Sequence, residues 1–182
     1  MMTRMNQRIA LCGILAGLLL VPGCILIRTT EHRITINDDG SGEAVLRLID
    51  LRSDETADSL VRRDFRIMLS SYEREGEESF GREGRTITSK KLYTRGDTLY
   101  AEVGYTFGSL MAIEGLHVTD DELYVVVPES REVVRTNGRT SSWINNGQRI
   151  VWSRETRLIM FQIREKTLPP STSLARLYRE IE

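Results

Sequence analysis

Residues 98–107, Thr98-Leu99-Tyr100-Ala101-Glu102-Val103-Gly104-Tyr105-Thr106-Phe107, decide the fold class of this chain. Apolar side chains occupy every second position from Leu99 to Phe107, and this period is typical of a strand with one buried face. Residues 86–93 predict a partner strand. The turn-forming residues 94–97 between the two predict an antiparallel hairpin.

The same kind of pattern extends on both sides of this hairpin. A strand at 33–36 leads through the Asn-, Asp- and Gly-rich turn 37–42 into an apolar strand at 44–51. After a short crossing at 109–116, further strands are expected at 123–127, 132–135, 149–153 and 157–164, with a long loop over 136–148. The last strand is apolar on both faces, which predicts a central position in the sheet.

One long helix is expected over 54–75, where apolar residues recur at three- and four-residue steps. A short terminal helix is expected over 171–182, after Pro169-Pro170 stops the sheet. The order of elements predicts an α+β fold, a curved antiparallel sheet of about six to eight strands packed against the long helix.

The N-terminal residues have the pattern of an export signal. Arg4 and Arg8 precede an apolar run over 9–21, and a small residue, Gly23, precedes Cys24. The run is shorter than the ~20 residues that a membrane-spanning helix needs. A plain secretory signal, without lipid attachment, is the alternative interpretation.

The four residues Val21-Pro22-Gly23-Cys24 resemble the bacterial lipoprotein box. This resemblance implies cleavage between Gly23 and Cys24 and attachment of a diacylglycerol to the Cys24 thiol, with a fatty acid such as palmitate on the new amino group. It also implies a bacterial cell-envelope location, anchored by lipid. Because Ile25 replaces the Asp of the inner-membrane retention signal, the outer membrane is favoured if the organism is Gram-negative.

Four segments follow from these patterns. We expect a lipoprotein signal peptide at 1–23, a lipid-anchored N-terminus with a short linker at 24–32, an α+β domain at 33–168, and a C-terminal helical tail at 169–182. The signal contains two arginines and no acid, so the remaining chain is slightly acidic, which argues against nucleic acid as a partner.

The sequence gives no pattern of an enzyme or a metal site. Cys12 leaves with the signal and Cys24 is used for lipid, so the folded part has no thiol. His32 and His117 each stand alone, without further ligands at metal-binding spacing. No nucleophile elbow or phosphate-binding glycine loop is present. We therefore expect no catalytic residue, no metal and no cofactor.

Trp143 is the candidate partner contact. It lies in the polar loop 136–148, which is bracketed by Asn137-Gly138 and Asn146-Gly147, so Asn137 and Asn146 are included in the candidate site. An exposed tryptophan on a loop often anchors a partner. The alternative is that Trp143 packs over the edge of the sheet.

Two functions remain open. The first is a non-catalytic interaction or scaffold lipoprotein that contacts an envelope protein or a glycan. The second is a binder of lipid or another hydrophobic ligand, held between the long helix and the sheet in a cavity of ~300 Å³ or more.

The mature part resembles the LppM-type lipoprotein domain over roughly residues 25–165. The resemblance rests on the Cys24 box, the turn Asp39-Gly40-Ser41-Gly42, the Tyr105-Thr106-Phe107 strand before Leu110-Met111, and an Asn-Gly loop before Trp152. It implies a curved sheet packed on helix and an association with lipidic ligands in the envelope. Gly108 stands where that family has an acidic residue, and residues 171–182 are too short to form its C-terminal membrane helix, so we transfer no binding residue.

Overall fold

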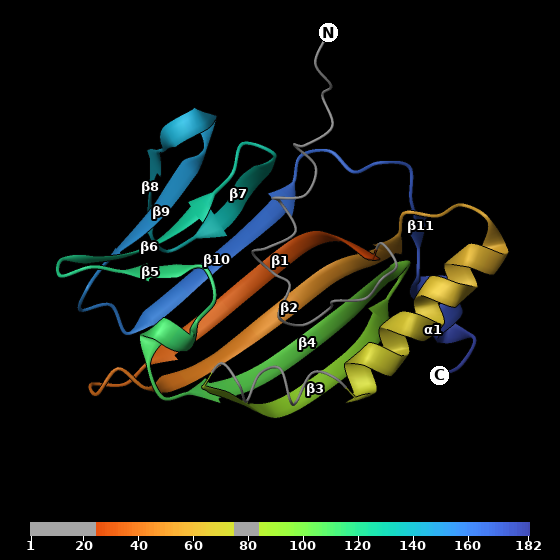
Figure 1. The fold of residues 1–182 in the computed structure, drawn as a ribbon, viewed down its shortest axis with the longest axis horizontal. Helices are drawn as coiled ribbons and strands as arrows, with labels where there is room; N and C mark the ends of the chain where they lie inside the picture. The colour runs from red at the N-terminus through yellow and green to blue at the C-terminus, as the bar shows by residue number, and fades with distance from the viewer. Residues whose placement is uncertain (1–24, 75–83) are drawn as a thin grey trace, which may run out of the picture.

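The computed structural model describes residues 25–74 and 84–182, and this part of the chain is dominated by antiparallel strands (Figure 1). The elements in chain order are β1 (Ile25–Ile36), β2 (Gly42–Ser53), α1 (Asp58–Arg74), β3 (Arg85–Arg95), β4 (Thr98–Phe107), the 3₁₀ turn η1 (Leu110–Ala112), β5 (Leu116–Val118), β6 (Glu122–Val127), β7 (Arg131–Thr136), β8 (Arg139–Ser142), the 3₁₀ turn η2 (Ile144–Asn146), β9 (Gln148–Ser153), β10 (Leu158–Glu165), β11 (Thr172–Ser173) and α3 (Ala175–Arg179).

The strands divide between two sheets. The larger has the order β3-β4-β2-β1-β10-β7, with β11 added on β2, and the smaller has the order β5-β6-β9-β8. The predicted antiparallel sheet with few helices is confirmed, and β10 is central as expected. The prediction of one sheet of about six to eight strands is wrong in extent, because alternation identifies strands without showing which sheet each one joins.

The segment from β7 to β9, which we call the bent hairpin, links the two sheets. β7 and β8 follow one another across Asn137-Gly138; β7 pairs with β10 in the larger sheet and β8 pairs with β9 in the smaller one. The hairpin tip is closed where the Trp143 N–H donates to the Gly147 carbonyl over 2.9 Å. The loop expected over 136–148 is therefore wrong in part, since it contains β8 and η2.

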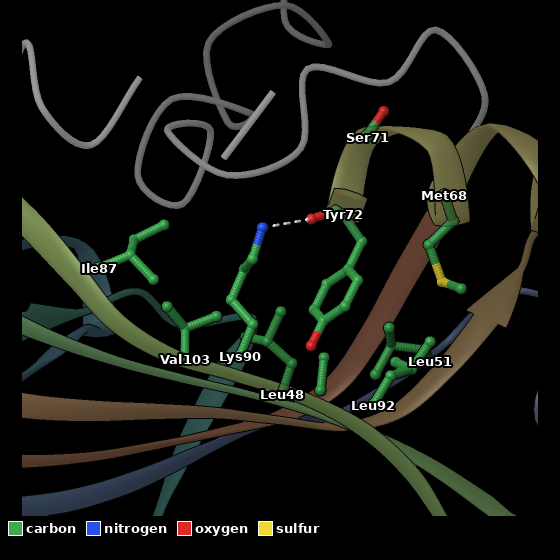
Figure 2. Close-up of a pocket in the computed structure, with 10 residues that line it drawn as sticks. Leu48, Leu51, Met68, Ser71, Tyr72, Ile87, Lys90, Leu92 and Val103 are labelled. Carbon is green, nitrogen blue, oxygen red and sulfur yellow. Dashed lines mark hydrogen bonds between the residues drawn. The ribbon is translucent and has the colours of Figure 1, made fainter. Parts of the chain in front are cut away.

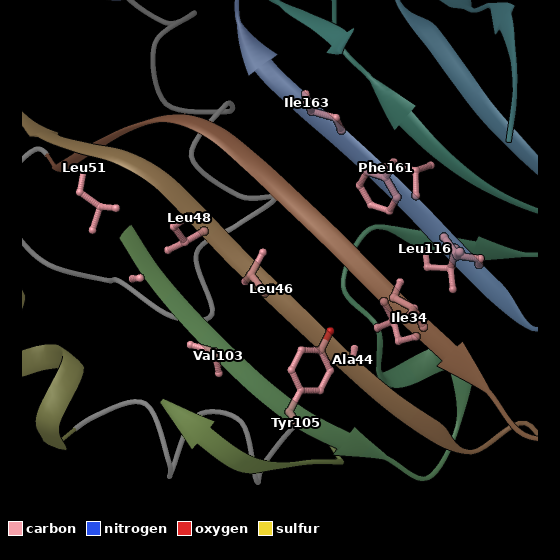
Figure 3. Packing of buried hydrophobic residues seen from close by; sticks show 14 of the residues in the cluster. Ile34, Ala44, Leu46, Leu48, Leu51, Val103, Tyr105, Leu116, Phe161 and Ile163 are labelled. Carbon is pink, nitrogen blue, oxygen red and sulfur yellow. The ribbon is translucent and has the colours of Figure 1, made fainter. Parts of the chain in front are cut away.

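The core lies on one face of the larger sheet. Figure 3 shows Leu46, Leu48 and Leu51 on β2 turned to the same side as Val103 on β4, and all of them are buried. The smaller sheet joins this core where the Trp152 ring lies 5.7 Å from that of Phe161 on β10. Burial of apolar side chains contributes about 25 cal/mol per Å² of area removed from water, so this shared core stabilises both sheets together.

The helix α1 begins later than the sequence suggests. It has 17 residues from Asp58, whereas the helical pattern predicted a start at 54. The reason is Ser53, the last residue of β2: its buried hydroxyl donates to Asp64 over 2.6 Å and accepts from the Glu55 N–H over 3.1 Å. These bonds fix the chain in a turn before the first helical residue.

The predicted linker at 24–32 is wrong for the residues that the structure describes. β1 begins at Ile25, which pairs with Ser53 of β2, so 25–32 belong to the sheet rather than to a linker before it. Thr29 and Thr30 are both buried in this strand. Two polar residues in succession hide the alternation on which strand prediction depends.

The predicted helical tail at 169–182 is also corrected. Thr172 and Ser173 form β11 against the end of β2, and the helix α3 has only five residues. Leu174 and Leu177 are buried in the common core, so this segment is part of the domain. Within 25–74 and 84–182, no helix has the length and apolar character needed to cross a membrane.

The stability of this fold should depend on the protonation of His32. Its ring stacks on Phe161 at 4.4 Å, and burial lowers its pKa from 6.5 to about 4. The unfolded chain takes up this proton below pH 6.5, but the folded chain does so only near pH 4. The free energy of unfolding should therefore fall by up to about 3 kcal/mol between pH 6.5 and 4.

A His32→Phe variant keeps the stacked ring and removes the titration, so its urea-unfolding free energy should be flatter over this pH range. His117→Phe, changed at an exposed position, is the matched control and should keep the slope of the original protein. Parallel curves for all three proteins would contradict the prediction.

Candidate functional site

The residues of the predicted lipid site lie outside the described part of the chain. Gly23 and Cys24 directly precede Ile25, the first described residue. What the structure adds is the position of the following residue, which is the first of β1 at the end of the larger sheet.

Trp143 lies at the tip of the bent hairpin and is half-buried. The guanidinium of Arg149 lies 5.0 Å from the centre of the Trp143 ring and 5.1 Å from that of Tyr124. The two rings are 5.9 Å apart and tilted by 40°. Trp143 therefore packs on the smaller sheet, as the alternative interpretation of the sequence held, and keeps part of its surface exposed.

Two further residues, His117 and Glu122, extend this cluster across the outer face of the smaller sheet. His117 on β5 stacks on Tyr124 at 4.7 Å, and Arg149 donates to the Glu122 carboxylate over 2.8 Å. We name His117, Glu122, Tyr124, Trp143 and Arg149 the tip cluster. Sequence reasoning identified only Trp143; the period of two in β6 and β9 would have shown that Tyr124 and Arg149 face outward, but not that their strands pair.

Asn137 has a structural role at the bend of the hairpin. Its side-chain oxygen accepts from the Trp152 indole N–H over 2.8 Å and from the Met160 N–H over 2.9 Å, and its amide donates to the Leu158 carbonyl over 2.7 Å. A Cβ on the next residue, Gly138, would lie only 2.6 Å from the Trp152 ring. The Asn-Gly pair thus lets β7 turn into β8 closely over the indole.

Asn146 belongs to the tip, next to Asn145, and both have positive φ values, 57° and 55°. Asparagine tolerates this left-handed conformation better than most residues. Its side chain is exposed and reaches Glu129 only over a long 3.5 Å contact. The structure therefore places Asn146 at the tip, three residues after Trp143. Asn137 lies at the bend instead, where its side chain is hydrogen-bonded.

The tip combines an exposed apolar side chain with aromatic and arginine side chains. Ile144, the neighbour of Trp143, is 70% exposed. Among the described residues, no group of three or more His, Cys, Asp or Glu side chains is arranged to hold a metal ion. An exposed apolar residue beside an aromatic–arginine cluster resembles the anchor of a protein interface.

A pocket lies between α1 and the larger sheet, where the second predicted function would place a ligand (Figure 2). Met68 and Tyr72 from α1 face Leu48 and Leu51 from β2 across it. Lys90 closes one side by donating to the Tyr72 carbonyl over 3.1 Å. Burial raises the pKa of the Tyr72 phenol to about 12.

The cavity in this pocket is small. Its volume of about 20 Å³ suits a single water molecule. An acyl chain or a comparable ligand would need ~300 Å³ or more. As it stands, the space between helix and sheet is a packed core with a small gap.

Comparison of the chain with protein-family models, with curated proteins and with solved structures gives no match.

The two predicted asparagines should respond differently to truncation. Asn137→Ala removes three hydrogen bonds and leaves the buried Trp152 N–H without its acceptor, so it should lower the free energy of unfolding by about 2–3 kcal/mol. Asn146→Ala should change it by less than about 1 kcal/mol, since the side chain makes only the long 3.5 Å contact with Glu129. Urea unfolding followed by tryptophan fluorescence measures both. Equal effects of the two substitutions would show that Asn137 does not hold the bend.

Proposed function

We propose that this chain is a bacterial envelope lipoprotein, anchored in the membrane through lipid on Cys24, that acts as a non-catalytic interaction module. The tip cluster with Ile144 is its partner-binding surface, and an envelope protein is the partner that its composition favours. In a Gram-negative organism the anchor lies in the outer membrane.

The observation on which the proposal depends is the start of β1 at Ile25, directly after Cys24. A lipid on Cys24 then joins the sheet without an intervening linker. The end of the domain that holds Ile25, Ser53 and Thr172 would lie at the membrane surface. Strand directions in the sheet would be fixed relative to the bilayer.

The smaller sheet would lie away from the end of the domain that carries the lipid. β1 has 12 residues, which span about 36 Å at ~3.3 Å per residue. After β9 the chain returns to the larger sheet at the far end of β1, where the Ile36 N–H donates to the Arg157 carbonyl over 2.9 Å. Figure 1 shows the smaller sheet at the left, beside β7 and β10, and β11 at the right, near α1 and the start of β1.

The second function, binding of a lipid or hydrophobic ligand between α1 and the sheet, has less support. It is favoured by the apolar lining of the pocket, and opposed by a cavity of only about 20 Å³. The resemblance to the LppM-type domain remains an expectation of the sequence. We therefore place the interaction module first.

Replacement of Cys24 tests the anchor. Cys24→Ser should abolish incorporation of radiolabelled palmitate and move the protein from the membrane fraction to the soluble fraction, because the acyl chains supply most of the membrane affinity. Cys12→Ser, a change at the other cysteine, is the control and should keep the label. A Cys24→Ser protein that still incorporates palmitate, or that still sediments with the envelope, would refute the anchor.

Site-specific photo-cross-linking tests the tip. A benzoylphenylalanine at position 144 should capture a discrete protein partner in cells, and Trp143→Ala in the same chain should reduce the adduct severalfold. The matched control is position 111, since Met111 is 78% exposed and lies in η1, outside the tip cluster. Absence of an adduct at 144, or the same adduct at 111, would exclude the tip as the binding surface.

A further inference from the structure

The outer face of the larger sheet contains a groove that the proposed function does not use. Its volume is about 400 Å³, and it lies over β2, β3 and β4. Its polar lining comes from Arg47, Lys91, Tyr93, Arg95 and Glu102. These strands are neighbours in the sheet order (Figure 1), so the side chains form one continuous surface.

Tyr93 and Arg95, which line the groove, pack together with the neighbouring Tyr100. Tyr93 on β3 and Tyr100 on β4 are directly paired, and their rings stack at 5.1 Å with an angle of 3°. The guanidinium of Arg95 lies over both rings, 5.4 Å from the centre of Tyr93 and 5.9 Å from that of Tyr100. Such cation–π contacts position the guanidinium while leaving its N–H groups available for hydrogen bonds.

The groove has an excess of positive charge. Glu102 is occupied by Arg47, whose Nε and Nη2 donate to one carboxylate oxygen over 3.0 and 2.7 Å. Arg47 also contacts Glu31 over 3.3 Å. In the part of the chain that the structure describes, neither Lys91 nor Arg95 has a carboxylate within salt-bridge distance, although both are exposed. Two cations therefore flank the stacked rings without a counter-charge.

We propose that this groove binds an anionic polysaccharide, one whose sugars bear carboxylate or phosphate groups. Arg95 and Lys91 would pair with successive anionic groups, because a guanidinium and an ammonium both form charge-assisted hydrogen bonds to such oxygens. The exposed edges of Tyr93 and Tyr100 would contact the apolar faces of the sugar rings between them. The site is separate from the tip cluster and does not require lipid on Cys24.

The composition of the groove favours a polysaccharide over a phospholipid or a protein. None of the large apolar side chains exposed in the described part of the chain, Met111, Val134, Ile144 and Ile181, belongs to its lining. Leu92, which is half-buried, is the one aliphatic residue of the lining, so the groove offers an acyl chain or an apolar peptide anchor little surface. A repeating, hydrated and charged chain matches a shallow groove of rings and cations.

Calorimetric titration of the purified full-length chain with polygalacturonate tests the proposal. Binding is expected at physiological salt and should weaken as salt rises. Lys91→Gln with Arg95→Gln should reduce affinity on the order of tenfold or more, and Tyr93→Leu, which removes one ring beneath Arg95, should reduce it severalfold. Neutral dextran should not bind.

Arg33→Gln is the matched control, because it removes one charge from an exposed arginine on the same face of β1, outside the groove. It should retain affinity within about twofold. The variants of Arg33, Lys91 and Arg95 should keep their urea-unfolding midpoint, since these side chains are exposed. The proposal is overturned if polygalacturonate does not bind, if Arg33→Gln weakens binding as much as the double variant, or if soluble dihexanoyl phosphatidylglycerol binds with the same dependence on Lys91 and Arg95.

Discussion

The hydrogen bond between the Trp152 indole and Asn137 is the interaction on which the two-sheet arrangement depends. It joins the residue where β7 bends to a ring that is buried between the sheets and packs on Phe161. A buried indole N–H without an acceptor costs about 1–3 kcal/mol, so the bend and the ring position stabilise one another. Gly138 allows the close approach that this geometry demands.

Because the hairpin belongs to both sheets, this bend also sets the direction of its tip. It joins β7, which pairs with β10 in the larger sheet, to β8, which pairs with β9 in the smaller one. A change of angle at the bend would move Trp143 and Ile144 relative to the rest of the domain. The tip is thus presented by a rigid element, although it is itself a short loop.

Much of the fold could be predicted from local sequence patterns. The strand 98–107 was predicted with its observed bounds, and the hairpins around 37–42 and 94–97 follow from turn residues that have few other uses. β8 could not be found this way, because all four of its residues are exposed and polar. Pairing of β1 with β10 joins residues more than a hundred positions apart, and no local pattern contains that information.

The candidate site was predictable only where one residue type is informative by itself. Trp143 stood out as an aromatic residue in a polar loop, whereas Arg149 and Tyr124 acquire their role by meeting it in space. Asn137 looked like a displayed turn residue, but its partners Trp152, Leu158 and Met160 lie 15 to 23 positions away. Among the described residues, Lys91 and Arg95 of the groove have no carboxylate within salt-bridge distance. This could not be predicted from the sequence, because it depends on the pairing of Glu102 with Arg47 in the structure.

The position of β1 has a mechanical consequence. The strand lies between β2 and β10 and is antiparallel to both. Its first described residue, Ile25, lies at one end of the strand. A pull on residue 25 along the strand therefore loads two rows of backbone hydrogen bonds in shear, and many of them must rupture together before the strand slides. A domain attached at this point would resist being torn from its tether far better than one attached through a strand that unzips bond by bond.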